Sequence, residues 1–513
     1  MTPIAGSSSL GPLERAVEER LETMKRDAVL RSIYRSDYTV WSKDPTEISD
    51  RLGWLHLPGT MKAHVAELEG FASTLKNEGV TKTILLGMGG SSLAPQVLAQ
   101  ASGIGPATFE VLDTTHPDAV AAIAQSVDPS RTTFIVASKS GTTLETLSQY
   151  RYFSSAFPEA RFVAITDPGT PLESLAHDDG FEKIFLNPPD IGGRYSALSL
   201  FGLVPAAMLG MNLELLLRSA DTASKDADDS QSDAAWLGAA IGEAALAGRD
   251  KLTFLVDNQI SLFGDWAEQL IAESTGKHSK GIVPVVGEPI GPVDVYGSDR
   301  IFLSMSEGID VSHLIDAGHP VIRMPPVDVK NLGAAFFIFE LAVSIAGYVL
   351  QINPFDQPNV SEAKEATARR LAGRGDQMGI GFDDASSLLD GIEQGDYLAL
   401  QMFLCPSAAI SEQARRIRTS LRDRFGVATT AGYGPRFLHS TGQLHKGGPA
   451  GGAFIQFVDE KIDRDIAIPG SDFGFRRLIQ AQADGDLESL RTKGRRVTRT
   501  TMGALLEALE AKP

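Results

Sequence analysis

The sequence predicts an α/β protein with parallel sheets, a helical N-terminal segment and a mixed C-terminal extension. Short apolar runs that end in Gly, Ser or Thr turns alternate with helical segments, which is typical of βαβ units. The runs fall into two sets, and this spacing predicts two α/β subdomains with a site between them. The predicted strands are residues 83–88, 109–113, 133–138, 161–166 and 183–187 in the first set, and 251–256, 281–286, 300–305 and 320–325 in the second.

The length of 513 residues exceeds what one core usually needs, so we expect several domains. Residues 1–10 are small and polar, and we expect them to be disordered. The pattern is mostly helical from residue 354 to about 424, and the glycine-rich stretch around Gly373 predicts a loop. The expected domains are an N-terminal helical segment (1–76), a first subdomain (77–235), a second subdomain (236–365) and a helical and mixed extension (366–513).

Charge and cysteine content exclude several classes of partner. The net charge of −18 repels nucleic acid and anionic membranes, so neither is expected as a partner. A single cysteine, Cys405, excludes an intramolecular disulfide and a Cys-rich metal site, and suits the cytoplasm. The N-terminus lacks the pattern of a secretory signal. Residues 333–350 are apolar, but Glu340 lies in their middle and no basic flank marks an orientation, so they predict a buried core helix.

A first glycine-rich loop, GMGGSS, directly follows the strand at 83–88. Gly89 and Gly90 allow a tight turn and a close approach to a ligand, and the N–H groups that open the next helix attract an anion. Ser91 adds a hydroxyl. The alternative is a degenerate dinucleotide fingerprint with Asp113 as the ribose-binding acid, although Ser92 replaces its third glycine.

A second loop, SKSGTT, follows the strand at 133–138. Ser138, Ser140 and Thr143 offer hydroxyls and Lys139 offers a cation, a combination that suits phosphate oxygens. A dinucleotide-binding fold has no need for this second loop. A Ser/Thr helix cap would explain one hydroxyl and leave the cluster unexplained.

Three further residues carry charges beside turns. Arg194 follows Gly192-Gly193, where a guanidinium could stabilise an oxyanion or pair with a structural carboxylate. Glu273, in AESTGK, ends a helical segment at a turn, which is a suitable place for a general base. Lys364 follows the Pro-bracketed NPFDQP turn, although a lone lysine is usually solvated.

Five motifs in order, GMGGSS, SKSGTT, GGRYS, ESTGK and NPFDQPNVSEAK, resemble phosphoglucose isomerase. The resemblance runs from about Leu13 to Lys364. The tail, with YGPRFLHSTGQLHKGG, resembles the isomerase half of fused transaldolase–phosphoglucose isomerase proteins. The transaldolase half would precede this region, so we expect no transaldolase activity.

The resemblance implies two sugar-isomerase (SIS) type, three-layer αβα subdomains and a cytoplasmic homodimer. It implies interconversion of glucose 6-phosphate and fructose 6-phosphate through a cis-enediol, with no metal or organic cofactor. The resemblance implies that Glu273 transfers the proton between C2 and C1, that Arg194 stabilises the enediolate and that Lys364 assists ring opening. It also implies a substrate loop at Gly89 and Gly90. The residues implied in phosphate binding are Ser91, Ser138, Ser140 and Thr143, with Lys139 nearby.

One departure concerns the histidine that the family usually presents between the ESTGK and NPFDQP motifs, often from a neighbouring subunit. The corresponding stretch, residues 293–300, contains none. We hypothesise that His445 or Lys446 folds back over the site to open the sugar ring. Other candidates are His278, His313, His319 and His439.

Two other functions remain open at this point. A non-catalytic phosphosugar-binding regulator would need both loops, but not Glu273, Arg194 and Lys364 together. A nucleotide-dependent oxidoreductase would use GMGGSS, and the second loop and the glutamate motif disfavour it. The sequence leaves open whether mannose 6-phosphate is also a substrate.

Overall fold

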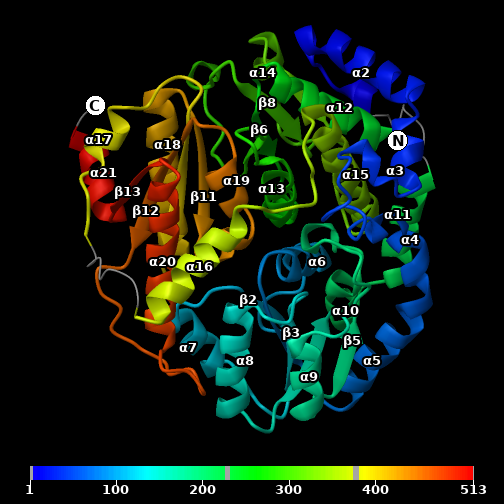
Figure 1. Ribbon diagram of the computed structural model, residues 1–513, viewed down its shortest axis with the longest axis vertical. Coiled ribbons are helices and arrows are strands. Elements are labelled where there is room, and N and C mark those ends of the chain that lie inside the picture. Colours follow the sequence, from blue (N-terminus) through cyan, green and yellow to red (C-terminus); the bar gives the residue numbers. More distant parts are fainter. Residues whose placement is uncertain (1–3, 226–231, 374–380, 512–513) are drawn as a thin grey trace.

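The computed structural model describes residues 4–225, 232–373 and 381–511, and its strands form three parallel sheets flanked by helices (Figure 1). In each sheet, the first strand in sequence lies between the second and the third. Ligands of such doubly wound sheets bind beyond the carboxyl ends of the strands. The predicted α/β class with parallel sheets is therefore confirmed.

The first sheet has the order β2-β1-β3-β4-β5. All five strands predicted for the first set are present. The three central strands are buried apolar runs, typical of parallel strands covered on both faces, whereas the two edge strands are partly exposed. The strands are β1 (Lys82–Gly87), β2 (Phe109–Leu112), β3 (Thr132–Ala137), β4 (Arg161–Thr166) and β5 (Lys183–Leu186). The accompanying helices are α5 (Val65–Asn77), α6 (Leu93–Ser102), α7 (Pro117–Gln125), α8 (Leu144–Ala156), α9 (Pro171–Asp178) and α10 (Leu200–Met208).

The second sheet has the order β7-β6-β8-β9, and it contains the four strands predicted for the second set. These are β6 (Lys251–Leu255), β7 (Val283–Val285), β8 (Arg300–Ser304) and β9 (Val321–Arg323). Its helices are α11 (Leu213–Lys225), α12 (Asp233–Leu246), α13 (Ser261–Thr275), α14 (Ser312–Asp316) and α15 (Leu332–Leu350).

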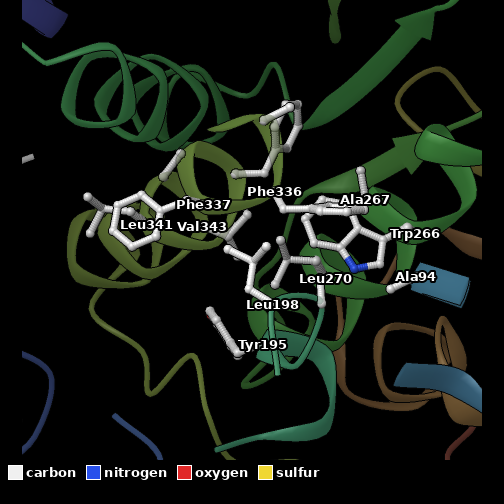
Figure 2. Close-up of a cluster of buried hydrophobic side chains, with 14 of the residues drawn as sticks. Ala94, Tyr195, Leu198, Trp266, Ala267, Leu270, Phe336, Phe337, Leu341 and Val343 are labelled. Carbon is white, nitrogen blue, oxygen red and sulfur yellow. The ribbon is translucent and has the colours of Figure 1, made fainter. Parts of the chain in front are cut away.

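Helix α15 is buried in the largest hydrophobic core, as the sequence predicted. Within the described residues it is the one helix long and apolar enough to cross a membrane, but α11, α12 and α13 pack around it. Gly238 of α12 allows a close approach, because a Cβ there would lie 2.5 Å from the Ala342 carbonyl oxygen. The core continues through Trp266 of α13 to Tyr195, so it joins the first two sheets (Figure 2).

A third parallel sheet, β11-β10-β12-β13, lies in the C-terminal part, where the sequence predicted mostly helix and then a mixed segment. The helical prediction was wrong for 397–403, because a short and completely buried run shows no alternation that separates strand from helix. The strands are β10 (Tyr397–Phe403), β11 (Ala428–Tyr433), β12 (Gly452–Val458) and β13 (Arg496–Thr500). The helices are α16 (Val360–Leu371), α17 (Ser386–Leu389), α18 (Ala408–Phe425), α19 (Gly442–Gly447), α20 (Phe475–Thr492) and α21 (Met502–Ala511).

The expected disorder at the N-terminus is wrong for residues 4–10. Ile4 and Leu10 are buried, and Ser9 forms a β-bridge with Val321. These contacts hold the segment in place. The prediction failed because it relied on the mostly small and polar composition and overlooked the two apolar side chains. The next helices are α1 (Ile4–Ser7), α2 (Glu14–Arg26), α3 (Val29–Tyr34) and α4 (Leu57–Thr60). Most of the predicted loop near Gly373, residues 374–380, lies outside the described residues.

The C-terminal elements pack against the carboxyl ends of the first sheet. Gln482 of α20 accepts a hydrogen bond from the Thr115 hydroxyl (2.7 Å) and donates one to the carboxylate of Glu145 (2.7 Å). His116 contacts Asp459 across the same boundary at 2.9 Å. Figure 1 shows α16 and α20 beside this end of the first sheet. The third sheet thereby brings its own loops to the region where the sequence places the site.

Candidate active site

The two predicted loops open at the carboxyl ends of β1 and β3, which are neighbours in the first sheet. In the second loop the hydroxyls lie in pairs, with Ser138 Oγ 2.8 Å from Thr143 Oγ1 and Ser140 Oγ 2.9 Å from Thr142 Oγ1. The loop turns at Gly141, whose φ of +66° suits glycine, and a Cβ there would lie 2.7 Å from Thr170. The result is a compact group of hydroxyls, of which those of Ser140, Thr142 and Thr143 line a cavity.

The first loop forms the 3-10 turn η5 (Gly89–Ser91), which packs on the turn η6 (Gly193–Tyr195). A Cβ on Gly90 would lie 2.0 Å from the Gly193 carbonyl oxygen, so only glycine allows this approach. Gly89 is equally confined, with a φ of +55° and a projected Cβ 2.7 Å from the His439 carbonyl. Ser91 is buried at the end of the turn. The two glycines thus hold together the elements that carry Arg194 and His439.

Arg194 and Glu273, predicted separately, form a buried ion pair, with Nη1 2.9 Å from Oε1. Their exposed fractions are 5% and 7%. Arg194 lies on η6, and Glu273 lies in the last turn of α13. The other end of the guanidinium donates to the carbonyls of Phe355 (2.5 Å) and Asp356 (2.8 Å). The guanidinium is thereby oriented by the NPFDQP turn and by the last turn of α13.

Two residues near Glu273 escaped the sequence predictions. Gln269, one helical turn before it, donates from Nε2 to Glu273 Oε2 (3.1 Å) and to the His439 carbonyl (2.7 Å). Lys277, one turn after it, is completely buried and donates to the carbonyls of Asn353 (2.7 Å) and Asp356 (2.6 Å). For Gln269 the i−4 spacing from the base was the available signal, because such residues share a helix face; Lys277 lies two residues beyond the end of α13, where helix periodicity gives no signal.

The electrostatics of Lys277 are unusual. Burial lowers its pKa to about 8, the neighbouring Arg194 acts in the same direction, and Asp356 opposes the shift. The ammonium forms an ion pair of 2.5 Å with Asp356. Lys277 therefore holds the NPFDQP turn against the end of the helix that carries Glu273.

A cavity of about 250 Å³ lies beside the second loop. Lys364 of α16 and His439 of the turn η9 (Arg436–His439) both line it, together with Ser140, Thr142 and Thr143. Lys364 is exposed, as a lysine at the rim of such a cavity would be. The structure thus brings a cation and an imidazole to the predicted phosphate loop.

Lys139 does not present a free ammonium to this cavity. It forms an ion pair with Asp167 and donates to the Pro189 carbonyl at 3.1 Å. The negative charge of Asp167 neutralises it. The prediction of a cation near the phosphate is therefore better matched by Lys364, which lines the cavity.

His445 is also not at the cavity, and the hypothesis that it folds back over the site is wrong. It is buried between the rings of Phe437 and Phe454, and its Nδ1 lies 3.2 Å from the amide of Gln401. Burial, reinforced by the charge of Lys446, keeps the pKa of its imidazole well below the ordinary value. Lys446 itself forms an ion pair of 2.6 Å with a buried aspartate.

His439, six residues earlier, is the histidine that reaches the site. Its Nε2 lies 3.0 Å from Glu145 Oε1 in α8, and the residue lines the cavity. Burial raises the pKa of Glu145, but the charges of His439 and Lys364 outweigh it and hold this pKa below the ordinary value. Glu145 therefore remains a carboxylate that can accept from and orient the imidazole.

Comparison with known proteins gives a consistent family. Residues 60–295 match the family model described as phosphoglucose isomerase. A glucose-6-phosphate isomerase of Rubrobacter xylanophilus is 26% identical over 64% of this chain and 90% of its own length. One of Parabacteroides distasonis is 28% identical over 62% of this chain and 86% of its own.

Solved structures agree in fold. A hypothetical protein of Thermus thermophilus has a TM-score of 0.58 and 25% identity, covering 71% of this chain and all of its own length. A glucose-6-phosphate isomerase of Chlamydia trachomatis, with a TM-score of 0.60 and 18% identity, covers 74% of this chain and 89% of its own and shows the same fold. Residues 60–295 thus carry the phosphoglucose isomerase domain, and the similarity to curated glucose-6-phosphate isomerases extends over more than 60% of the chain.

Proposed function

We propose that this chain interconverts glucose 6-phosphate and fructose 6-phosphate through a cis-enediol intermediate. The observation that carries the proposal is the buried ion pair of Arg194 and Glu273 at 2.9 Å. It lies between the turns η5 and η6 on one side and the NPFDQP turn on the other. A base and an oxyanion-stabilising cation are the two groups that proton transfer beside a carbonyl requires. The names of the relatives support the same reaction.

The phosphate end of the substrate is assigned to the hydroxyls of Ser91, Ser138, Ser140 and Thr143. Neutral hydroxyls and backbone N–H groups bind an anion without a full countercharge. Lys364 supplies the local cation that the strongly acidic chain otherwise lacks, whereas Lys139 shapes the loop through its pairing with Asp167.

Glu273 takes the proton from C2 of the open-chain aldose, and the electron pair of that C–H bond forms the enediolate. The carboxylate then returns the proton to C1, while the hydroxyl proton shifts between O1 and O2, which gives the ketose. Arg194 stabilises the enediolate, and this charge exists only around the transition states, so the interaction lowers the barrier. Gln269 holds Glu273 in place.

Ring opening is assigned to His439 together with Lys364. Because Nε2 of His439 faces the Glu145 carboxylate, the other ring nitrogen is left for the sugar. An imidazole oriented by a carboxylate is a suitable general acid–base for moving a proton between the ring oxygen and the C1 hydroxyl. This assignment replaces His445.

We also propose a cytoplasmic location and a homodimer, and the reaction proposed uses no metal or organic cofactor. The single cysteine and the family resemblance support the location and the dimer. Light scattering after size exclusion tests the homodimer, and a mass equal to that of one chain would contradict it.

The alternative of a non-catalytic phosphosugar-binding regulator has no observation in its favour, because a regulator does not require the Arg194–Glu273 pair. A coupled assay that converts fructose 6-phosphate to glucose 6-phosphate separates the two. We expect Glu273→Gln to lower kcat roughly 10²- to 10⁴-fold. Glu268→Gln, on the same helix but lining a different cavity, is the matched control and should leave turnover unchanged. Equal activity of wild type and Glu273→Gln would overturn the proposal.

A further inference from the structure

A second cavity, of about 240 Å³, lies against α13, and Leu93, which directly follows the first loop, also lines it. Helix α18, strand β11 and the turn η9 supply its remaining walls, so it lies where the third sheet meets the second. The residues that define its chemistry are Asp265, Glu268, Arg418, Tyr433, Arg436 and Phe437. None of them belongs to the proposed catalytic set.

One wall carries two carboxylates that lack partners. Asp265 and Glu268 are one turn apart on α13. No hydrogen bond or ion pair within 4 Å joins either carboxyl side chain to a residue that the structure describes, and the charges of Arg418 and Arg436 act on both from farther away. Burial raises the pKa of both, and the mutual proximity contributes to raising that of Glu268 to about 8. Carboxyl groups withdrawn from water are stable only when something donates to them. The cavity is the direction from which a donor can come.

The opposite wall carries the guanidinium of Arg418, which forms no salt bridge within 4 Å among the described residues, while the charges of Glu288 and Glu268 act on it from farther away. Arg418 is 5% exposed, and its Nε and Nη2 donate to the hydroxyl and carbonyl of Thr429 (3.3 and 2.6 Å). Its Nη1 lies 3.5 Å from the projected Cβ of Gly287, which lines the cavity. The other two guanidiniums of the lining are already paired, Arg415 with Glu412 and Arg436 with Asp113.

We propose that this cavity binds a small zwitterion, a molecule with an ammonium group and a carboxylate, of which the free α-amino acids are the simplest. The ammonium would donate to Asp265 and Glu268, and the carboxylate would accept from Arg418. A simple anion would face the two carboxylates, and a simple cation would face the guanidinium. A metal ion is disfavoured as well, because no group of three or more His, Cys, Asp or Glu that could hold one occurs among the described residues.

One element, the turn η9, contributes to the walls of both cavities. Along η9, Arg436 and Phe437 line the second cavity, while Leu438 and His439 line the first. On α13, Glu268 is followed by Gln269, whose amide holds both Glu273 and the His439 carbonyl. A ligand that pulls α13 and η9 together would therefore change the placement of the base and of His439. This coupling rests on the proposed function, whereas the binding itself does not.

Binding is tested on the full-length protein with the twenty free L-α-amino acids, by thermal shift and then calorimetry. A ligand that binds the native state raises Tm by mass action, so at least one amino acid should raise Tm saturably. The double variant Asp265→Asn/Glu268→Gln, close in shape, should abolish the shift and retain basal turnover. The decarboxylated and N-acetylated forms of the same amino acid should bind at least tenfold more weakly. Saturating inorganic phosphate should not compete.

The proposal is overturned if no amino acid shifts Tm, if the shift survives in the double variant, or if phosphate competes, since competition would place the ligand at the first cavity. Ala431→Leu, which fills the same cavity, replaces the double variant if that protein fails to fold. Coupling has its own readout: saturating amino acid should change kcat/KM for fructose 6-phosphate at least twofold in wild type only. Unchanged kinetics with intact binding would refute the coupling, and inactive wild type with intact binding would refute only the isomerase assignment.

Discussion

Replacement of Lys277 by methionine tests whether the NPFDQP turn positions Arg194. The ammonium is completely buried and has three acceptors, namely the carbonyls of Asn353 and Asp356 and the Asp356 carboxylate. The same turn supplies both carbonyls that orient Arg194. Methionine keeps much of the volume and removes all three interactions at once. The turn then loses its attachment to the end of α13.

The magnitude follows from these contacts. Removal of one partner from a buried ion pair costs about 3–5 kcal/mol. The Asp356 side chain is 21% exposed and can recover part of its hydration, so we expect a loss of about 2–3 kcal/mol in unfolding free energy. Displacement of the guanidinium from the developing charge should lower kcat about 10- to 100-fold, because one oriented donor contributes on that scale or above. The KM should change little, since the phosphate loops are not attached to Lys277.

Urea unfolding and the coupled isomerase assay measure the two effects on the same preparation. The matched control is Lys280→Met, because Lys280 is exposed and its ammonium donates to the Leu350 carbonyl at 2.9 Å. It should change stability by less than about 1 kcal/mol. A Lys277→Met protein that unfolds earlier but retains wild-type kcat would refute the idea that the turn positions Arg194.

Three further outcomes are expected. Gly90→Ala should lower the unfolding free energy by about 1–3 kcal/mol and remove most of the activity, because the new Cβ would lie 2.0 Å from the Gly193 carbonyl oxygen. Thermal unfolding and the coupled assay measure the two effects, and wild-type behaviour would contradict the packing of the two turns. His439→Ala should slow turnover of cyclic substrate roughly 10²-fold, whereas His445→Ala should mainly lower Tm, and the reverse pattern would restore the His445 hypothesis. Lys277 has a pKa of about 8 in the folded protein against an ordinary value of 10.5, so between these pH values the unfolded chain binds more protons than the folded one. The stability of wild type relative to Lys277→Met should therefore rise by about 3 kcal/mol from about pH 7.5 to about pH 10.5. Urea unfolding at a series of pH values measures this difference, and a fall in stability would contradict the predicted sign.

Local motifs with their own chemistry were predictable from the sequence. The strands of the first two sheets were found because each buried run ends in a Gly, Ser or Thr turn, which marks the carboxyl end of a parallel strand. Arg194 and Glu273 were named from separate turns, and the structure joins them at 2.9 Å. Their contact depends on the packing of η6 against α13, and the spacing of the two residues along the chain does not predict it.

The errors have a common physical origin in long-range contacts. His439 and His445 lie in the same HSTGQLH motif, but their imidazoles point in different directions. The packing of η9 against α8 places His439, and not His445, at the cavity. Lys139 looked like a free cation because its partner, Asp167, comes from the loop after the next strand. The strand at 397–403 was missed because burial on both faces removes the alternation by which strands are recognised.

The shared strand order of the sheets raises the question of why the phosphate is assigned to the first sheet and not to the second. The loop after β8 occupies the place that the second phosphate loop occupies after β3, and it too has a serine and a glycine, with the Gly308 N–H donating to Ser306 Oγ at 3.0 Å. There, however, the Ser306 hydroxyl donates to the Asp257 carboxylate at 2.6 Å. A carboxylate already takes the hydroxyl proton and repels a second anion, whereas the hydroxyls of Ser138 and Ser140 are paired with neutral threonines and keep donors available. We therefore infer that charge in the adjoining loop, rather than the fold of the sheet, favours the first sheet as the proposed phosphate site.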